Sequence, residues 1–260
     1  MLIRWFFMAL LMPLQLFSVD TNQTTIAPIV SYLLSDSENK KLGRIMPLGD
    51  SITWDWYYYD RRPDSLKTGY RSHLWWKLKD THYEMNFVGS RSNGSSVSPS
   101  YDGDNEGHTG EDTYYIALNM DNWLKQNTPD TILLHIGTND PRITTEWQAV
   151  HNIEYTLNVI EQFERKENVK IKVILAKIIS YPAQAAWVSS FNSQLDSMAQ
   201  QRIDAGDDII VVDMENGANL DYSKDLIDGI HPTNCGYEKM ANVWYEALTG
   251  KDGPGLKSCY

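Results

Sequence analysis

Four short motifs in this chain carry residue types suited to nucleophilic attack on a carbonyl carbon. In chain order they are Gly49-Asp50-Ser51-Ile52-Thr53, Phe87-Val88-Gly89, Gly137-Thr138-Asn139-Asp140 and Asp228-Gly229-Ile230-His231-Pro232. A serine hydroxyl becomes a strong nucleophile when a base removes its proton, and a histidine oriented by a carboxylate is such a base. The motifs therefore hold a nucleophile, a base with its orienting acid, and residues that offer N–H donors.

Ser51 is the candidate nucleophile. Gly49 opens a tight turn before it, which would expose the hydroxyl and direct nearby backbone N–H groups. Taken alone, Gly-Asp-Ser is more typical of an ordinary turn or helix cap, so the assignment depends on the other motifs.

Asp228 and His231 are the candidate acid and base. Because they are three residues apart on one turn, both side chains can point the same way. The carboxylate would fix the imidazole tautomer and leave the other ring nitrogen free for the Ser51 proton. A lone histidine in a loop is otherwise an ordinary surface residue.

Gly89 and Asn139 are the candidate oxyanion-hole residues, together with the backbone N–H of Ser51. Attack on an ester leaves negative charge on the former carbonyl oxygen, and N–H donors stabilise it. The alternative for residues 137–140 is a turn after a strand, since Gly, Asn and Asp all favour turns.

The elements that must position these residues follow an α/β pattern, which predicts a parallel sheet covered by helices on both faces. Strands are expected at residues 44–48, 85–88, 131–136, 169–179 and 209–212, and helices at residues 70–80, 113–126, 145–164, 184–203 and 237–248. Ligands bind beyond the carboxyl ends of such strands, and the first three motifs follow the first three strands. Residues 90–112 are expected to form one long loop beside this edge.

The four motifs resemble those of the SGNH, or GDSL-type, hydrolase superfamily over about residues 44–248. The resemblance implies ester hydrolysis without a cofactor on a three-layer α/β/α sandwich with a five-stranded, flavodoxin-like parallel sheet. It also implies the roles of the hallmark residues and the triad acid, here Ser51, Gly89, Asn139, His231 and Asp228.

A narrower similarity is to the secreted acetylxylan esterases of carbohydrate esterase family 3. The segments that carry it are residues 45–51, 69–71, 86–90 and 104–108. Where that family often continues the last segment with Gly-Trp, this chain has Thr109-Gly110-Glu111. The similarity implies an acetylated polysaccharide as substrate, with different local contacts in this segment.

Aromatic residues after the nucleophile also favour a sugar substrate. Trp54 and Trp56, with the tyrosines at 57–59, are candidates for stacking on sugar rings, although such rings can equally pack a loop. Arg71 and His108 are further candidates for lining the site. No set of histidine, cysteine or acidic residues has convincing metal-ligand spacing.

Length and charge narrow the class of protein. The chain has 260 residues, and we expect one domain at residues 43–260, acting as a monomer. The net charge of -11 disfavours binding to nucleic acid or to anionic membranes. It is compatible with a neutral polysaccharide.

The N-terminus is typical of a secretory signal, expected at residues 1–19 and followed by a tether at residues 20–42. Arg4 precedes the apolar run Trp5–Phe17, which is shorter than the ~20 residues of a spanning helix. The alternative is an uncleaved anchor.

Secretion changes the interpretation of two other features. Asn22 and Asn93 become candidate N-glycosylation sites in a eukaryotic host. The only two cysteines, Cys235 and Cys259, are expected to form a disulfide in an oxidising compartment; the alternative is two unrelated buried thiols.

The sequence therefore predicts a secreted serine esterase that removes acetyl groups from a plant-type polysaccharide, foremost acetylated xylan. The alternatives are a lipid-acting esterase or lysophospholipase on the same fold, and a carbohydrate-binding protein on a catalytically dead scaffold.

Overall fold

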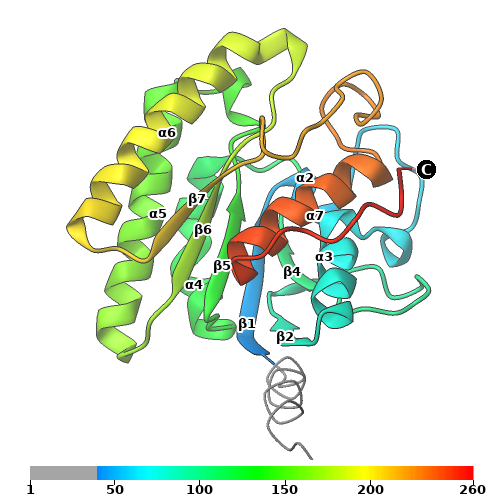
Figure 1. Cartoon of the computed structure of the whole chain (residues 1–260). Coiled ribbons are helices and arrows are strands. Elements are labelled where there is room, and N and C mark those ends of the chain that lie inside the picture. Colours follow the sequence, from blue (N-terminus) through cyan, green and yellow to red (C-terminus); the bar gives the residue numbers. More distant parts are fainter. Residues whose placement is uncertain (1–39, 260) are drawn as a thin grey trace, which may run out of the picture. The chain divides into compact units, whose positions relative to one another are not determined.

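The computed structural model describes residues 40–259 of the chain (Figure 1). The predicted signal at residues 1–19, most of the predicted tether and the candidate glycosylation residue Asn22 lie outside the described residues. The first strand, β1 (Lys40–Gly49), begins four residues earlier than expected, so residues 40–42 belong to the sheet and not to the tether. These residues gain backbone partners because they pair with the start of β2 (Tyr83–Phe87).

The predicted α/β fold is confirmed: five long strands form a parallel sheet in the order β2-β1-β5-β6-β7. The remaining three are β5 (Thr131–His135), β6 (Lys172–Lys177) and β7 (Ile209–Asp213). After β1 the chain forms β2 on one side of β1. It later crosses to the other side of β1 and adds β5, β6 and β7 in order. The strand order therefore changes direction between β1 and β5, which is where ligands bind in open sheets of this type.

Two short strands enlarge the predicted five-stranded sheet to seven. They are β3 (Arg91–Ser92) and β4 (Asp104–Gly107), and both lie in the segment that the sequence predicts as one long loop. β4 runs parallel to the last two residues of β1, and β3 is antiparallel to β4. Their residues are polar, so no apolar run announces them; pairing with β1 is what makes β4 a strand.

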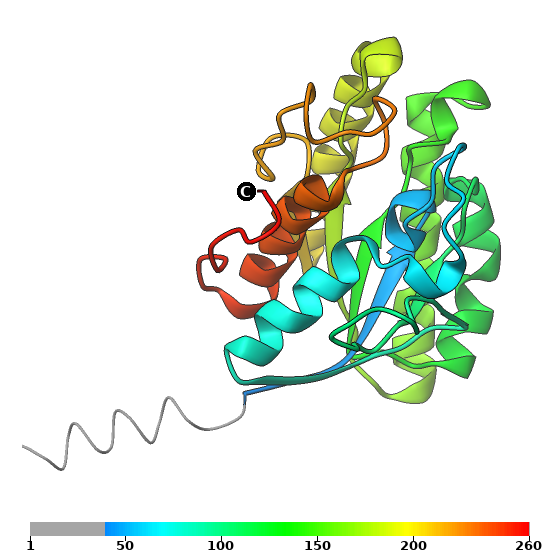
Figure 2. The ribbon, with the colours of Figure 1, turned by 90° about the vertical axis from the view of Figure 1, so that its right-hand side faces the viewer.

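Helices cover both faces of the sheet, which gives the three-layer sandwich (Figures 1 and 2). One face is covered by α3 (Gly69–Asp80) and α7 (Asn234–Thr249), the other by α4 (Thr113–Gln126), α5 (Glu146–Glu167) and α6 (Ala185–Ala205). Short helical turns complete the chain, namely α2 (Ser51–Trp54), η1 (Asp64–Leu66), η2 (Asp140–Arg142) and η3 (Pro182–Gln184).

Two hydrophobic cores flank the sheet, and alternate residues of each central strand enter them. In β5, Ile132 and Leu134 pack with α4, α5 and α6, whereas Leu133 packs with α3 and α7. Side chains alternate between the two faces of a strand, so a strand buried on both sides must be apolar throughout. This explains why the central strands are visible in the sequence as continuous apolar runs.

Capping residues fix where several helices begin. The Asp112 carboxylate accepts from the N–H of Tyr115 at 2.8 Å at the start of α4, which is the predicted helix 113–126. Helix α7 begins three residues before the predicted position because Thr233 caps it. An N-cap oxygen of this kind satisfies an N–H that has no partner inside the helix.

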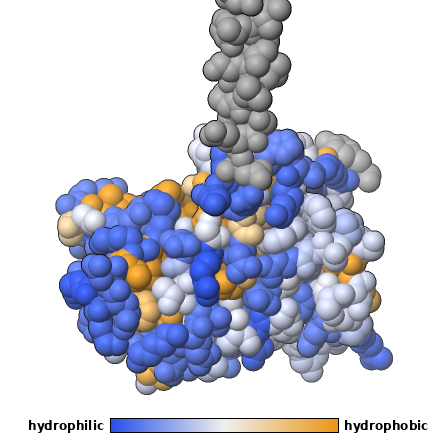
Figure 3. Space-filling view, turned by 90° about the horizontal axis from the view of Figure 1, so that it is seen from below, coloured by the Kyte–Doolittle hydropathy of each residue, from blue (hydrophilic) through white to orange (hydrophobic). Residues whose placement is uncertain are grey.

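The surface at the amino ends of the strands lies opposite the motif-bearing loops. Most of it is hydrophilic, with separate small hydrophobic areas (Figure 3). Scattered apolar residues are normal on folded proteins and do not by themselves mark a binding site. Among residues 40–259, no helix has the length and apolar character needed to cross a membrane.

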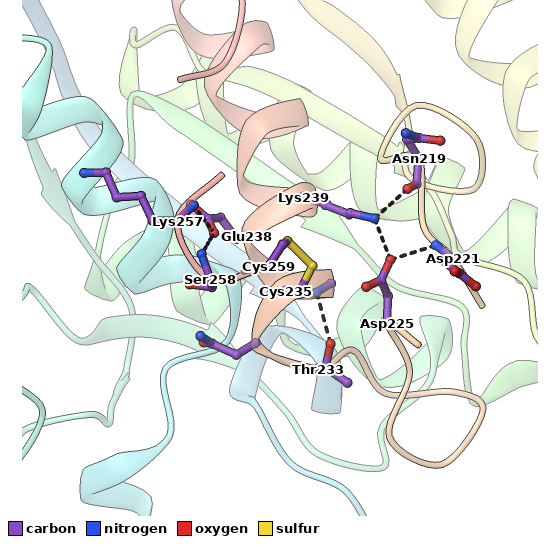
Figure 4. Close-up of a disulfide and its surroundings, with 12 residues drawn as sticks. Asn219, Asp221, Asp225, Thr233, Cys235, Glu238, Lys239, Lys257, Ser258 and Cys259 are labelled. Carbon is purple, nitrogen blue, oxygen red and sulfur yellow. Dashed lines mark hydrogen bonds and ion pairs between the residues drawn. A yellow bond between two sulfur atoms is a disulfide. The ribbon is translucent and has the colours of Figure 1, made fainter. Parts of the chain in front are cut away.

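A disulfide between Cys235 and Cys259 joins the first turn of α7 to the C-terminal tail (Figure 4). The Glu238 carboxylate holds the same tail by accepting from the N–H groups of Lys257 and Ser258 at 2.8 and 2.5 Å. Its other partner is the Nζ of Lys77 on α3, at 3.1 Å. The tail is thereby fastened to both helices on this face of the sheet.

Replacing both cysteines, Cys235→Ser with Cys259→Ser, is expected to lower the free energy of unfolding by about 3 kcal/mol. The bridge closes a loop with a sequence separation of 24, and closing such a loop restricts the unfolded chain by about this amount. Urea unfolding of the oxidised wild type and the double variant measures the difference. An unchanged midpoint would show that the Glu238 contacts alone hold the tail.

Candidate active site

Ser51 is the first residue of the short helix α2, directly after β1. The Asp50 carboxylate caps this helix by accepting from the N–H of Ile52 at 2.9 Å. Gly49, one residue earlier, lies so close to β5 that a Cβ atom there would be 2.1 Å from the carbonyl oxygen of His135. A side chain at residue 49 would push the two strands apart, so the turn before Ser51 requires glycine.

The structure brings Ser51, His231 and Asp228 together in one line of hydrogen bonds. The Ser51 Oγ lies 2.9 Å from the His231 Nε2, and the His231 Nδ1 lies 2.9 Å from an Asp228 carboxylate oxygen. Ser51 is buried, and the side chains of His231 and Asp228 are partly exposed. This is the geometry in which a histidine takes the proton of a serine while a carboxylate holds the ring.

The Asp228 carboxylate has more partners than the histidine ring. Its Oδ1 also accepts from the N–H groups of His231 and Ile230, at 2.8 and 3.1 Å. Partial burial raises the pKa of Asp228, but these backbone bonds and the His231 ring lower it more, and the net pKa is below the ordinary value. The group therefore stays ionised while it orients the ring.

The turn that carries both residues is closed at its base. Leu226 and Pro232 form an isolated bridge, and the N–H of Ile227 donates to the His231 carbonyl at 2.8 Å. Below the bridge, the buried Asp225 accepts from the Nζ of Lys239 on α7 at 2.7 Å (Figure 4). The position of His231 is thus set by α7 through an ion pair and backbone bonds.

Asn139 follows β5 and lies at the same edge of the sheet as Ser51. The strand residues Gly49 and His135 are register partners, so the two motifs leave neighbouring strands at the same level. One N–H of the Asn139 amide donates to the Glu111 carbonyl at 2.8 Å. A side-chain amide has two such N–H donors, which leaves the second for a ligand.

Gly89 follows β2 and touches the backbone of β4. A Cβ atom at this position would be 2.0 Å from the carbonyl oxygen of Asn105, so no other residue fits. β4 in turn pairs with β1 at Gly49, where the N–H of His108 donates to the Gly49 carbonyl at 2.8 Å. The missed strand β4 therefore joins the Gly89 motif to the Ser51 motif.

Asp140, next to Asn139, is a fully buried carboxyl group that the sequence does not single out. It accepts from the backbone N–H and hydroxyl of Thr113, at 3.2 and 2.5 Å. Burial raises the pKa of Asp140 to about 7, although the Thr113 bonds act in the opposite direction. The Thr113 hydroxyl also accepts from the Asn152 amide at 3.0 Å, so this network fastens the Asn139 turn to α4 and α5.

Three of the four predicted substrate contacts are corrected, because Trp54, Arg71 and His108 are buried. The Arg71 guanidinium donates to the carbonyls of Thr53 and Gly103 and to the side chain of Asn93, at 2.9, 3.1 and 2.5 Å. It is a structural tie between the loops. A sequence cannot distinguish such an arginine from a surface one, because its acceptors are backbone carbonyls far along the chain.

His108 is buried for a different reason. Its ring stacks on Trp123 of α4, with centroids 4.6 Å apart, and its Nε2 lies 2.7 Å from a Glu106 oxygen. The side chain is therefore occupied by protein partners on both its face and its edge.

The candidate glycosylation residue Asn93 is also corrected. Its side-chain nitrogen, where a glycan would be attached, donates to the Trp54 carbonyl at 2.7 Å. Its side-chain oxygen accepts from Arg71 and from Asn105, and only 4% of the residue is exposed. A glycan at this nitrogen would break the network that holds the loop.

The aromatic loop after α2 presents different rings from the two tryptophans that the sequence favours. Trp54 is buried under Arg91, 5.3 Å from its ring, and Trp56 is half-buried. Tyr58 and Tyr59 are 75% and 77% exposed. These two tyrosines therefore offer the accessible aromatic surface of the loop.

An arginine clamp holds this loop. The Arg62 guanidinium donates to Asp55 and to Asp60 at 2.8–3.2 Å, and the Asp55 carboxylate also accepts from the N–H of Thr68. The N–H of Asp55 donates to the Ser51 carbonyl at 2.8 Å, so the loop leaves the end of the one-turn helix that Ser51 begins. The exposed tyrosines are thus carried on a segment braced from both ends.

Comparison with known proteins identifies the family. The family model "GDSL-like Lipase/Acylhydrolase" matches residues 45–244. The chain belongs to this family. The match includes all four motifs, and the superfamily resemblance seen in the sequence is confirmed.

Solved structures place the fold beside carbohydrate esterases. A family 3 carbohydrate esterase from Clostridium thermocellum is 31% identical, with a TM-score of 0.64, 82% of this chain and 100% of that chain covered. A family 3 carbohydrate esterase from Talaromyces cellulolyticus is 25% identical, with a TM-score of 0.67 and coverage of 80% and 96%. By its family and these neighbours, the chain is an ester hydrolase.

Two curated relatives are longer proteins. A "Multidomain esterase" from Ruminococcus flavefaciens is 27% identical over 81% of this chain, which spans 29% of that relative. A "Putative endoglucanase X" from Acetivibrio thermocellus is 32% identical over 54% of this chain, which spans 62% of that protein. The chain thus covers less than two thirds of the length of either relative.

We expect Asp140→Asn to change how stability depends on pH. In the folded wild type this carboxyl keeps its proton up to about pH 7, whereas an unfolded aspartate loses it near pH 3.9. The folded state therefore binds the extra proton, and the wild type loses stability as pH rises through this window. Between pH 4 and pH 8, the free energy of unfolding of the wild type should fall by roughly 2–4 kcal/mol relative to that of the variant.

Urea unfolding of both proteins across this range measures the effect, because other titrating groups are common to the two. A difference between wild type and Asp140→Asn that stayed constant with pH would contradict the raised pKa.

Proposed function

We propose that this chain is a serine esterase that removes acetyl groups from a plant-type polysaccharide, foremost acetylated xylan. The observation that carries the proposal is the hydrogen-bonded line from Ser51 through His231 to Asp228. Its location on a fold shared with family 3 carbohydrate esterases supports the substrate class.

The first half-reaction forms an acyl-enzyme. The Ser51 Oγ attacks the acetyl carbonyl carbon while its proton moves to the His231 Nε2, 2.9 Å away. The electron pair of the C=O bond moves to the oxygen, where the N–H groups of Ser51 and Gly89 and the free N–H of Asn139 stabilise it. When this intermediate collapses, the bond to the sugar oxygen breaks, and His231 returns the proton to that oxygen.

The second half-reaction releases acetate. A water molecule attacks the acetyl carbon and gives a proton to His231. The bond to the Ser51 Oγ then breaks, and the proton returns to the serine. Asp228 remains ionised throughout, consistent with its lowered pKa, and stabilises the imidazolium that forms twice in the cycle.

Charge and exposed rings support a neutral sugar polymer as substrate. The chain carries a net charge of -11, which disfavours polyanions. The accessible pair Tyr58 and Tyr59 is carried on the loop that follows α2, the one-turn helix that Ser51 begins. Aromatic rings combine a large apolar face with a polar edge, which suits the apolar faces and hydroxyl edges of sugar rings.

The proposal includes secretion. The charged start and the apolar run Trp5–Phe17 support it. The Cys235–Cys259 disulfide supports it further, since such bonds persist in oxidising compartments.

Ser51→Ala is expected to abolish acetate release from acetylated xylan, with a fall in kcat of about 10⁴-fold or more. The hydroxyl is the group that forms the bond to the acetyl carbon, and alanine leaves nothing in its place. Acetate release by purified wild type and variant is the measurement, alongside 4-nitrophenyl esters from acetyl to octanoyl.

We expect the wild type to prefer acetyl over butyryl and longer esters. Turnover that increased with acyl length would assign the enzyme to lipids. Absence of turnover in the wild type, with polysaccharide binding retained, would favour a binding protein on the same scaffold.

Removing the tyrosine pair, Tyr58→Ala with Tyr59→Ala, is expected to raise KM for acetylated xylan about five- to tenfold. This corresponds to about 1 kcal/mol of lost stacking. KM for 4-nitrophenyl acetate, which is too small to use the loop, should stay unchanged. Tyr114→Ala, which removes a 57% exposed tyrosine on α4, is the matched control. Equal effects on polymer and small ester would rule out a polymer contact.

A further inference from the structure

The Glu106 carboxylate in β4 is fully buried and joins three donors. One oxygen accepts from the N–H of Ser90 at 2.6 Å, and the other accepts from the Ser90 hydroxyl at 2.6 Å and from the His108 Nε2 at 2.7 Å. A buried carboxylate is costly unless its oxygens are satisfied in this way. Short bonds to an ionised acceptor are also about twice as strong as neutral ones.

The residue that Glu106 holds is the immediate neighbour of Gly89. On the other side of Gly89, the N–H of Val88 donates to the Ile45 carbonyl of β1 at 2.9 Å. Behind Gly89, the backbone of Asn105 leaves no room for a Cβ atom. The Phe87–Val88 peptide is thus held by β1 and the Gly89–Ser90 peptide by Glu106. The peptide that carries the Gly89 N–H lies between these two held neighbours.

The other partner of Glu106 leads back to the nucleophile strand. The N–H of His108 donates to the Gly49 carbonyl at 2.8 Å, two residues before Ser51. The His108 ring is held against Trp123, so it is a rigid support for the carboxylate. Glu106 therefore connects the segment after β2 to the strand end that precedes Ser51.

We propose that Glu106 is a positioning residue for the oxyanion hole, holding the Gly89 N–H where charge develops on the acetyl oxygen. This inference rests on the proposed function, which gives Gly89 its role. Oxyanion donors act because they are aimed before the reaction starts. A displacement of about 1 Å in such a group is enough to cost about 10²-fold in rate.

The geometry explains why a carboxylate stands at residue 106. Only an ionised carboxylate accepts on both of its oxygens without donating. Glutamine at this position offers one acceptor oxygen, and its NH₂ group must face either the Ser90 N–H or the pair formed by the Ser90 hydroxyl and the His108 ring. In the first orientation the bond from the Ser90 N–H is lost. In the second, the Ser90 hydroxyl and the His108 ring must change from donors to acceptors, and their bonds to an ionised group are replaced by weaker neutral ones.

The test compares Glu106→Gln and Ser90→Ala with wild type on 4-nitrophenyl acetate. Glu106→Gln should lower kcat about 10- to 100-fold with KM within threefold, because the carboxylate acts on the transition state and not on substrate binding. Ser90→Ala removes only the hydroxyl contact and keeps the backbone one, so it should lower kcat about two- to fivefold. Rates are divided by the active-site concentration from a burst titration, which removes any effect of misfolded enzyme.

Phenylboronic acid supplies a second readout, because it forms a tetrahedral adduct with an active-site serine. Its inhibition constant should rise in the two variants in proportion to the loss of kcat. A general loss of stability does not produce this proportionality once active sites are counted.

Glu238→Gln is the matched control. Glu238 is a buried carboxylate that also accepts from two backbone N–H groups and a cationic side chain, but it fastens the C-terminal tail (Figure 4). It should lower the melting temperature and leave kcat per active site unchanged.

The proposal is overturned if Glu106→Gln keeps wild-type kcat, or if kcat falls while boronate inhibition stays constant. If Glu106→Gln yields no folded protein, an unchanged kcat in Ser90→Ala overturns it. Failure of the proposed function is a separate result, seen as wild-type enzyme without esterase activity or as activity that survives Ser51→Ala.

Discussion

The close approach of β1 and β5 at Gly49 and His135 is the contact on which the site depends. Their backbones lie too near for any side chain at residue 49. These two strands flank the point where the strand order changes direction, which is where ligands bind in open α/β sheets. Ser51 follows one of these strands and Asn139 the other. The pairing of β1 with β5 therefore limits how far apart the candidate nucleophile and the candidate amide donor can be.

Much of this arrangement is predictable from the sequence, because the central elements are encoded by apolar patterns. β5, β6 and the second half of β1 are apolar runs, because helices cover both faces of the sheet there. β2 instead alternates, with Tyr83, Met85 and Phe87 buried and the polar residues between them more exposed. Helix α4 matches its predicted bounds because Asp112 caps one end and a proline closes the other. β3 and β4 could not be predicted, since Asp104-Asn105-Glu106-Gly107 has the composition of a turn. Its strand conformation comes from pairing with β1, which is a tertiary contact.

The candidate site divides in the same way. Asp228 and His231 are three residues apart, so their mutual geometry is local and visible in the sequence. The supporting polar residues are not. Arg71, Asn93 and His108 have the composition of surface or substrate-binding residues, and all three are buried. Most of their partners are distant in the sequence: Arg71 donates to the Thr53 carbonyl and to Asn93, and the His108 ring stacks on Trp123, although its Nε2 meets Glu106 only two residues away. The sequence does not reveal these partners, so the three residues are expected to contact the substrate or to carry a glycan.

This buried polar shell has a physical purpose that an apolar packing could not serve. The loops beyond the strand ends are polar because they must reach a solvated substrate, so they contribute few apolar contacts of their own. Buried charged groups hold these loops instead, with Arg71 donating hydrogen bonds and Glu106 accepting them. Such groups are stable only when nearly all their donors or acceptors are paired. Few alternative loop conformations meet that requirement. N–H donors can stay fixed around a developing negative charge only if the loop that carries them has nearly one conformation. The energetic cost of burying these charges is therefore linked directly to the precision of the site.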